Sequence, residues 1–179
     1  MNAKLVLSFV ILILAGSILN CSTWKCEDDE NKQLVHRAFL VLNQREYDKL
    51  DQFIAPDYKR HCQATPDAEV ESLDDFRALL RIWDTQMPDA VTKLDVVIAE
   101  GDLVAFYGSY SGTQTAPMGP FPATGKKMTA DFGGYHRIEG GKIAETWVTW
   151  DNMVILSQLG HFPPPAEKRE VKKKDLEGN

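Results

Sequence analysis

The sequence predicts an α+β fold in which a cone-shaped, strongly bent antiparallel sheet is covered by N-terminal helices. Apolar residues recur at helical spacing through most of residues 31–86. From residue 91 onward the spacing changes to the period of two that is typical of β-strands. Two short turns, Gly101-Asp102 and Gly140-Gly141, divide this second half into hairpins. Helices followed by antiparallel strands are typical of α+β proteins whose helices cover one sheet face.

The first part of the domain is expected to be mainly helical. Residues 31–43 place apolar side chains on one helical face and charges on the other. Residues 46–54 continue as a helix, and Pro56 marks its end because the residue before a proline avoids helical geometry. Residues 58–63 then form a short strand candidate.

The next helix and the strands have clearer limits. Ser72 is a good N-cap for a helix over residues 73–86. The expected strands cover residues 91–100, 103–111, 127–139 and 142–150. A loop rich in proline and glycine, residues 113–126, lies between the hairpins and is expected to form the rim of the cone. A last short helix, residues 152–159, ends at Gly160.

The composition sets limits on the class of protein. The 179 residues are 44% hydrophobic and 26% charged, which is close to globular averages and excludes a disordered or coiled-coil chain. This length suits one domain. The net charge of −6, with no basic stripe, argues against nucleic-acid binding, because phosphate neutralisation needs clustered Lys and Arg.

Residues 1–20 are expected to be a secretion signal. The apolar run over residues 5–14 follows a short basic start and is too short for a membrane-spanning helix. Two cleavage sites compete, Ala15-Gly16-Ser17 for ordinary signal peptidase and the lipobox-like Ile18-Leu19-Asn20-Cys21. The second is favoured, and it predicts a bacterial lipoprotein anchored to the membrane through lipidated Cys21, in the periplasm or at the cell surface. The alternative is a soluble exported protein.

The expected domain covers residues 31–160. Residues 21–30 form a polar tether before it, and residues 161–179 form a charged, flexible tail after it. Cys26 and Cys62 could form a disulfide in an oxidising compartment or stay free thiols. No Cys/His spacing typical of zinc, Ser-His-Asp order or phosphate-binding glycine loop is present, so no metal ion or cofactor is predicted.

The second hairpin predicts which side chains share a face of the sheet. With Gly140-Gly141 as its turn, regular pairing places His136 opposite Glu145. One face then carries Phe132, His136, Ile138, Ile143, Glu145, Trp147, Thr149 and Asp151. Apolar walls with a few polar groups are what a small-molecule pocket needs. Phe106 is a further candidate for the core or the pocket wall, as are Trp83, Met87 and Tyr110. A bulge would break this register.

Several segments are similar to those of one known family, in the same order and at similar spacing. They are Ile98–Ala105, Tyr110–Thr113, Ala123–Lys127, His136–Trp147 and Trp150-Asp151, with Ala55–Tyr58, His61 and Pro88–Ala90 upstream. Over residues 31–160 the chain therefore resembles the SnoaL-like polyketide cyclase / ester cyclase family.

The resemblance implies a fold and a chemistry. The fold is the nuclear-transport-factor-2-like cone. The family's founding cyclases close a polyketide ring by intramolecular aldol condensation without metal or cofactor, using an aspartate as general acid/base. Asp151 matches that aspartate, and His61, Glu145 and Trp147 match recurrent pocket positions. His61 would then assist Asp151, and Trp147 with Phe132 would shape the pocket.

Each of these residues also has a structural interpretation. Asp151 directly precedes residues 152–159 and could cap that helix, which would stabilise its anion instead of raising its pKa. His61 could be an ordinary strand histidine. Glu145 and His136 could pair across the strands and only neutralise each other.

Three functions remain open. The first is a cofactor-independent cyclase-type enzyme acting on a small apolar carbonyl compound. The second is a non-catalytic exported lipoprotein that binds a small hydrophobic ligand in the same cone. The third is an interaction module whose outer sheet face pairs with another protein or with itself. The chain would be a monomer or a homodimer.

Overall fold

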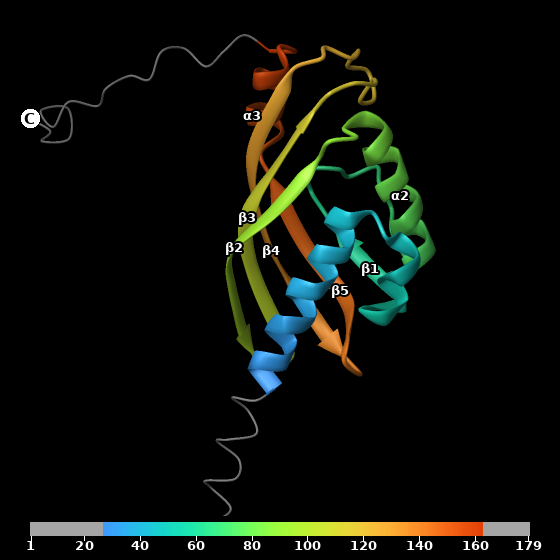
Figure 1. The fold of residues 1–179 in the computed structure, drawn as a ribbon, viewed down its shortest axis with the longest axis vertical. Coiled ribbons are helices and arrows are strands. Elements are labelled where there is room, and N and C mark those ends of the chain that lie inside the picture. Colours follow the sequence, from blue (N-terminus) through green and yellow to red (C-terminus); the bar gives the residue numbers. More distant parts are fainter. Residues whose placement is uncertain (1–26, 163–179) are drawn as a thin grey trace, which may run out of the picture.

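The computed structural model describes residues 27–162, which form a curled sheet with helices on its concave side (Figure 1). The sheet has five strands in the order β1-β5-β4-β3-β2. The strands are β1 (Ile54–His61), β2 (Val91–Glu100), β3 (Leu103–Thr113), β4 (Lys127–Glu139) and β5 (Lys142–Trp150). The helices are an N-terminal helix (27–44), the 3-10 helix η1 (Tyr47–Gln52), α2 (Leu73–Gln86) and α3 (Asn152–Leu159). The predicted fold class is confirmed.

Local signals place the ends of the later elements. The Ser72 hydroxyl accepts a hydrogen bond from the backbone N–H of Asp75 at 3.1 Å and so caps α2. Gly140 and Gly141 both have positive φ angles, 57° and 74°, as a tight hairpin turn requires. Gly160 ends α3 in the left-handed conformation with φ 84°.

Two expectations about the region before α2 are wrong. Residues 46–54 do not form an α-helix, because only Tyr47–Gln52 is helical, as a 3-10 turn, and Ile54 already belongs to β1. Pro56 does not mark a helix end, since it lies inside β1. This strand is at the edge of the sheet, where a residue without an N–H is tolerated. β1 also pairs with β5 in parallel, while all other pairs are antiparallel.

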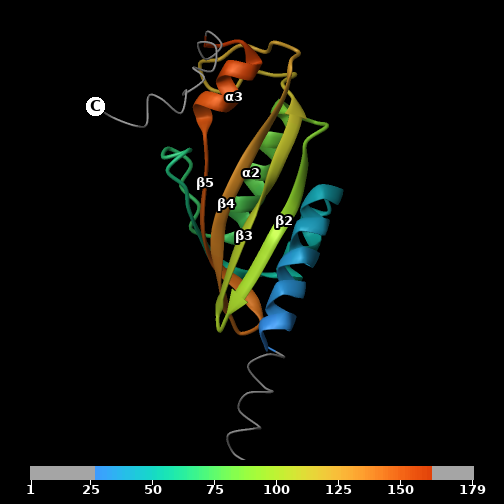
Figure 2. The same cartoon turned by 90° about the vertical axis from the view of Figure 1, so that its left-hand side faces the viewer.

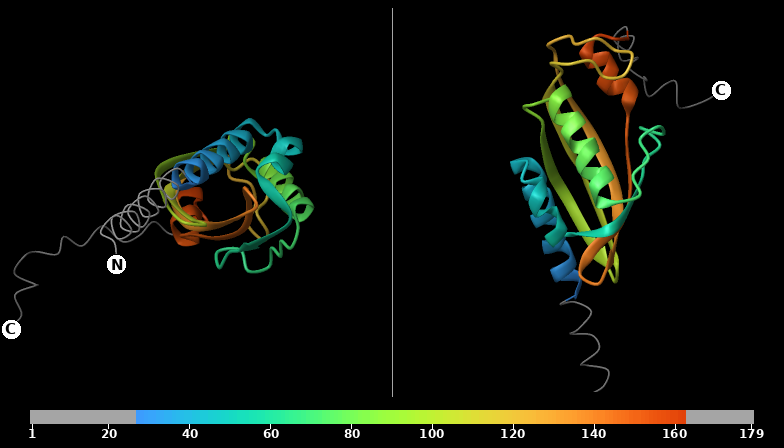
Figure 3. Two further views of the ribbon diagram at one scale, coloured as in Figure 1. Left: turned by 90° about the horizontal axis from the view of Figure 1, so that it is seen from below. Right: turned by 90° about the vertical axis from the view of Figure 1, so that its right-hand side faces the viewer.

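The sheet is strongly curled, and seen from below the N-terminal helix and α2 lie across its concave side (Figure 3). Two of its strands, β4 and β5, approach one another closely at Gly134, where a Cβ would lie 2.0 Å from the carbonyl oxygen of Trp147. The opposite, convex face is not covered by these helices (Figure 2).

The main core lies between the concave face and the helices. It contains Val35, Leu50, Tyr58 and Val104, which are all at least 98% buried. No helix within residues 27–162 is long and apolar enough to cross a membrane. The signal segment, Cys21 and Cys26 lie outside the described residues, as does the tail from residue 163. Within residues 27–162, the Cys62 thiol is free.

Candidate functional site

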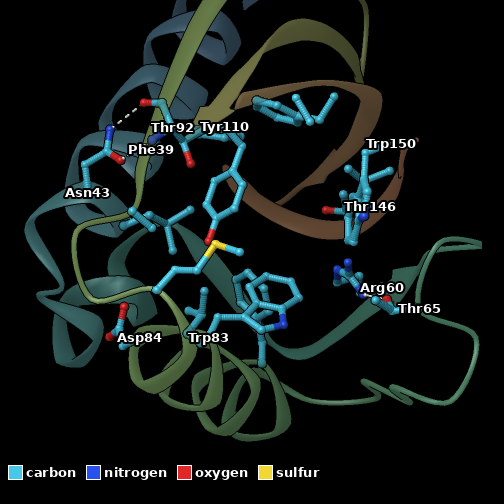
Figure 4. A pocket seen from close by; sticks show the side chains of 18 of the residues that line it. Phe39, Asn43, Arg60, Thr65, Trp83, Asp84, Thr92, Tyr110, Thr146 and Trp150 are labelled. Atoms are coloured by element: carbon cyan, nitrogen blue, oxygen red, sulfur yellow. Dashed lines mark hydrogen bonds between the residues drawn. The ribbon is translucent and has the colours of Figure 1, made fainter. Parts of the chain in front are cut away.

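A cavity of about 260 Å³ lies between the concave sheet face and the helices (Figure 4). Its walls are mostly apolar and aromatic. They include Phe39, Leu42, Trp83, Phe106, Phe132 and Trp150. An apolar hollow of this kind, with a few polar groups, is typical of a small-molecule site.

A bulge in β5 decides which side chains face this cavity. Ile138 pairs with Ile143 as expected, but Arg137 pairs with Glu145, which leaves Ala144 as an extra residue. His136 therefore lies opposite Thr146 and not opposite Glu145. Beyond the bulge every side chain of β5 changes face, because side chains alternate along a strand.

His136 lies on the cavity wall, as do Phe132 and Phe106, where the sequence placed them. Its Nδ1 is 2.8 Å from the Thr146 hydroxyl, and its ring stacks on Phe106 with 4.5 Å between centroids. Burial lowers the pKa of His136 to about 3, so the imidazole is neutral at ordinary pH. Its Nε2 has no hydrogen-bond partner among the described residues.

Arg60 is a second buried polar group on the wall. The residue is 7% exposed, and its guanidinium lies over the rings of Trp83 and Trp150 at 5.2 and 5.5 Å from their centroids. Nη1 donates to the Thr65 hydroxyl at 3.2 Å. Nη2 is buried and has no partner in the part of the chain that the structure describes.

A carboxylate and a phenol occupy another part of the wall. Asp84 on α2 accepts hydrogen bonds from the Tyr47 hydroxyl at 2.8 Å and from Arg45 Nε at 3.1 Å. The Tyr110 hydroxyl on β3 makes no hydrogen bond to any residue within 27–162. Burial, with the negative charge of Asp84 as a smaller cause, raises the pKa of Tyr110 to about 12, so the phenol is protonated. We call Asp84, Tyr110, His136 and Arg60 the cavity cluster.

Three of the predicted site residues face the opposite way. His61, Glu145 and Trp147 lie on the outer face of the sheet and do not line the cavity, so the placement predicted for them is wrong. His61 Nε2 donates to Glu145 Oε1 at 2.6 Å, and Arg137 Nη2 donates to Glu145 Oε2 at 3.1 Å. These hydrogen bonds, from His61 first and then from Arg137, lower the pKa of Glu145.

Aromatic rings complete this group. Trp147 is stacked between His61 and Tyr135, with ring centroids 4.9 and 4.7 Å away. We call His61, Glu145, Arg137, Trp147 and Tyr135 the outer cluster.

Asp151 is exposed and caps α3. Its Oδ1 accepts hydrogen bonds from the backbone N–H groups of Met153 at 2.8 Å and Val154 at 3.3 Å. The residue does not line the cavity, so its predicted position facing an enclosed hollow is wrong. The physical reason is again the bulge in β5, together with the cap, which holds the carboxylate at the helix terminus. Neither Asp151 nor His61 lines the cavity, and the catalytic roles predicted for them stay predictions.

Sequence reasoning missed Arg60 and Asp84 as site residues. A signal for Arg60 was present, because Tyr58 is an inward-facing apolar residue of a strand and residue 60 must then share its face. Asp84 follows Trp83 on an amphipathic helix, and nothing local distinguishes it from a solvated carboxylate. The described residues bring together no group of three or more His, Cys, Asp or Glu side chains suited to a metal ion.

A curled sheet closed by helices around an apolar cavity defines a cone-shaped α+β protein built to enclose a small molecule. The family model described as SnoaL-like polyketide cyclase matches residues 32–159. The chain therefore belongs to the SnoaL-like polyketide cyclase family. Among the curated proteins, none matches the chain closely enough to count as a relative.

Solved structures share the fold. TsrD from Streptomyces laurentii is 26% identical, with a TM-score of 0.67 over 75% of this chain and 97% of its own. IdmH from Streptomyces antibioticus is 23% identical, with a TM-score of 0.65 over 73% of this chain and 98% of its own. A SnoaL-like polyketide cyclase from Agrobacterium tumefaciens is 18% identical, with a TM-score of 0.64 over 73% and 98%. At the two lower identities the likeness concerns the fold alone.

Proposed function

We propose that the protein is a cofactor-independent, cyclase-type enzyme that acts on a small, largely apolar carbonyl compound inside the cavity. Membership in the SnoaL-like polyketide cyclase family supports a cyclase-type function. One observation carries the finer proposal. In a mostly apolar cavity, the phenol of Tyr110 has no hydrogen-bond partner within residues 27–162 and lies close enough to the carboxylate of Asp84 for that charge to raise its pKa.

An aldol-type ring closure needs two groups from the protein. One removes a proton from the carbon next to a carbonyl, and the other stabilises the negative charge that develops on the carbonyl oxygen. Asp84 takes the proton in this proposal, and the neutral phenol of Tyr110 donates a hydrogen bond to the oxygen of the enolate. The enolate carbon then attacks a second carbonyl carbon of the same molecule, and the alkoxide formed there takes the proton back from Asp84. Arg45 and Tyr47 hold the Asp84 carboxylate in place through their hydrogen bonds.

The proposal keeps the aspartate chemistry that the family resemblance implies but transfers it to another residue. Asp84 lines the cavity, whereas Asp151 is an exposed helix cap. His136 contributes a neutral polar contact in an apolar wall, since its Nε2 has no partner within the described residues. The aromatic walls then exclude water, while the polar groups orient the carbonyl.

The test is proton exchange, which needs no knowledge of the natural substrate. Purified protein is incubated in D2O with small cyclic aromatic ketones such as 1-tetralone and 2-tetralone, and deuterium uptake at the carbon next to the carbonyl is followed by NMR. We expect Asp84→Asn and Tyr110→Phe each to lower the rate by about 100-fold. Asp151→Asn is the matched control and should retain the rate. Wild-type exchange no faster than that of Asp84→Asn would overturn the proposal.

The alternative is the exported lipoprotein that binds a small hydrophobic ligand without turning it over. The mostly apolar cavity favours it, since such a hollow retains a ligand without chemistry. With it we propose export through residues 1–20 and membrane attachment at Cys21. Native mass spectrometry of protein from its host separates the two functions. A retained ligand that Asp84→Asn does not change, with no ketone exchange, supports the binder.

A further inference from the structure

Arg60 is a buried cation that has no counter-charge among residues 27–162. It comes from β1, is 7% exposed and lines the cavity. Its one side-chain hydrogen bond is to the neutral hydroxyl of Thr65, and its Nη2 has no partner within residues 27–162. A buried charge without a counter-charge is strongly unfavourable unless something completes it.

The carboxylates that line the cavity are engaged elsewhere. Asp84 forms its ion pair with Arg45 at 3.1 Å. Asp131 accepts from the Tyr107 hydroxyl at 2.7 Å, at an exposed position. Among the described residues, no carboxylate forms a salt bridge with Arg60.

The two tryptophans beside Arg60 restrict how an anion can reach it. The rings of Trp83 and Trp150 are 84° apart, and the guanidinium lies over both. Ring faces attract the cation but accept no strong hydrogen bond, so the N–H groups in the guanidinium plane keep their donating capacity. A planar guanidinium with free N–H groups matches a carboxylate. A carboxylate carries the single negative charge that balances Arg60. A phosphate dianion carries one negative charge too many.

We propose that the substrate of this cavity carries a carboxylate that binds Arg60, at a distance from its reacting carbonyl. Figure 4 shows Arg60 and Thr65 on one side of the cavity and Asp84 on the other, with Trp83 and Tyr110 between them. An oxo-carboxylic acid with an apolar middle fits this order of groups. Its charged end meets Arg60, its apolar body lies against the aromatic walls, and its carbonyl reaches Tyr110. That the bound molecule is a substrate rests on the proposed function. That the cavity binds a carboxylate at Arg60 does not.

The test compares two probes of nearly the same shape, the anion 2-naphthoate and the neutral 2-naphthamide, by isothermal titration calorimetry at pH 7. We expect the wild-type protein to bind naphthoate about tenfold more tightly than the amide, or more. Arg60→Met should remove that preference, so that naphthoate and the amide bind with equal affinity. Arg81→Met, an exposed arginine on α2, is the matched control and should retain it. Equal wild-type affinities, or a preference that persists in Arg60→Met, would overturn the proposal.

A second variant and the ketone-exchange assay distinguish loss of the carboxylate site from loss of folding or of the proposed function. If Arg60→Met does not fold, the wild-type comparison and Arg60→Lys decide. The lysine keeps the charge without the planar fork, so a reduced preference supports the site and an absent wild-type preference removes it. Ketone exchange reports separately on the proposed function. A preference for naphthoate without ketone exchange would overturn the proposed enzyme function and support the carboxylate site. Ketone exchange without that preference would support the enzyme function and overturn the carboxylate site.

Discussion

On two strands of the sheet a residue of the cavity cluster is followed directly by a residue of the outer cluster, yet the chemistry of the two clusters is opposite. His61 follows Arg60 on β1, and Arg137 follows His136 on β4. In the outer cluster the charged groups bond to one another, as His61 and Arg137 both donate to Glu145. In the cavity cluster, Arg60 and His136 each keep a buried nitrogen with no partner within residues 27–162.

This difference shows what separates a binding site from a surface network. The outer cluster has the residue types that resemble a catalytic group, a histidine, a glutamate and a tryptophan, but its charged groups are already paired with one another. In the cavity cluster Asp84 is also paired, whereas Arg60 and His136 are buried and each has a nitrogen without a partner among the described residues. A buried polar group of that kind is unfavourable until a ligand supplies the partner. Unused hydrogen-bonding capacity in a dry place is therefore a better guide to the site here than residue type.

The largest expected effect concerns the backbone that separates the two clusters. Gly134→Ala puts a Cβ 2.0 Å from the Trp147 carbonyl oxygen, so β4 and β5 must move apart. We expect the free energy of unfolding to fall by about 3 kcal/mol. At Gly133 the new Cβ would lie 3.2 Å from the Tyr107 ring and 3.5 Å from the Phe106 carbonyl oxygen, so the loss should stay under about 1 kcal/mol. Urea unfolding measures both, and equal losses would show that close approach does not shape the cavity face.

A smaller effect should distinguish the clusters by pH. His136 has a pKa of about 3 in the folded protein against an ordinary 6.5. Above pH 6.5 it is neutral in both states. As the pH falls below 6.5 the unfolded chain binds a proton that folded His136 does not, so the protein loses stability down to about pH 3. The loss reaches about 1.4 kcal/mol per pH unit, or about 2 kcal/mol between pH 6.5 and 5.

The Glu145 carboxylate of the outer cluster titrates in another range. The pKa of Glu145 is lowered from 4.5 in the folded protein. Its contribution to the free energy of unfolding is therefore complete above pH 4.5 and is lost only as the pH falls further, through the folded pKa. Urea unfolding between pH 7 and 5 should therefore give a shallower slope for His136→Gln than for wild type, and the wild-type slope for Glu145→Gln. Identical slopes in all three proteins would mean that His136 is not desolvated.

Most of the fold could be predicted because its signals are local. The Ser72 cap, the glycine turns and the change of period gave correct limits for α2, β2, β4, β5 and α3. The region before α2 was harder to predict. Proline is tolerated both at a helix end and in an edge strand, so Pro56 does not distinguish the two. The parallel pairing of β1 with β5 joins segments far apart in the sequence, and no local pattern encodes it.

The site could be predicted only in part, for one physical reason. Regular pairing from the glycine turn holds for Ile138 and Ile143 and then fails at Ala144, a residue with no feature typical of a bulge. One extra residue exchanges the two faces of β5, so Glu145 and Trp147 turn outward. β4 has no extra residue, so His136 and Phe132 line the cavity, and their role in binding stays a prediction. Arg60 could have been placed from the alternation that starts at Tyr58, whereas Asp84 depends on tertiary packing, which periodicity does not report.

The smallest expected effect belongs to Asp151, where the sequence and the structure favour different roles. As the N-cap of α3 it accepts two backbone N–H groups, so Asp151→Ala should lower the free energy of unfolding by about 1 kcal/mol. Asp151→Asn should cost less, because asparagine caps helices equally well, and neither change should slow ketone exchange. If Asp151→Asn instead lost exchange by tenfold or more at unchanged stability, this carboxylate would have to reach the reacting carbon from the end of β5. A place on the wall of this cavity would then no longer identify the catalytic carboxylate.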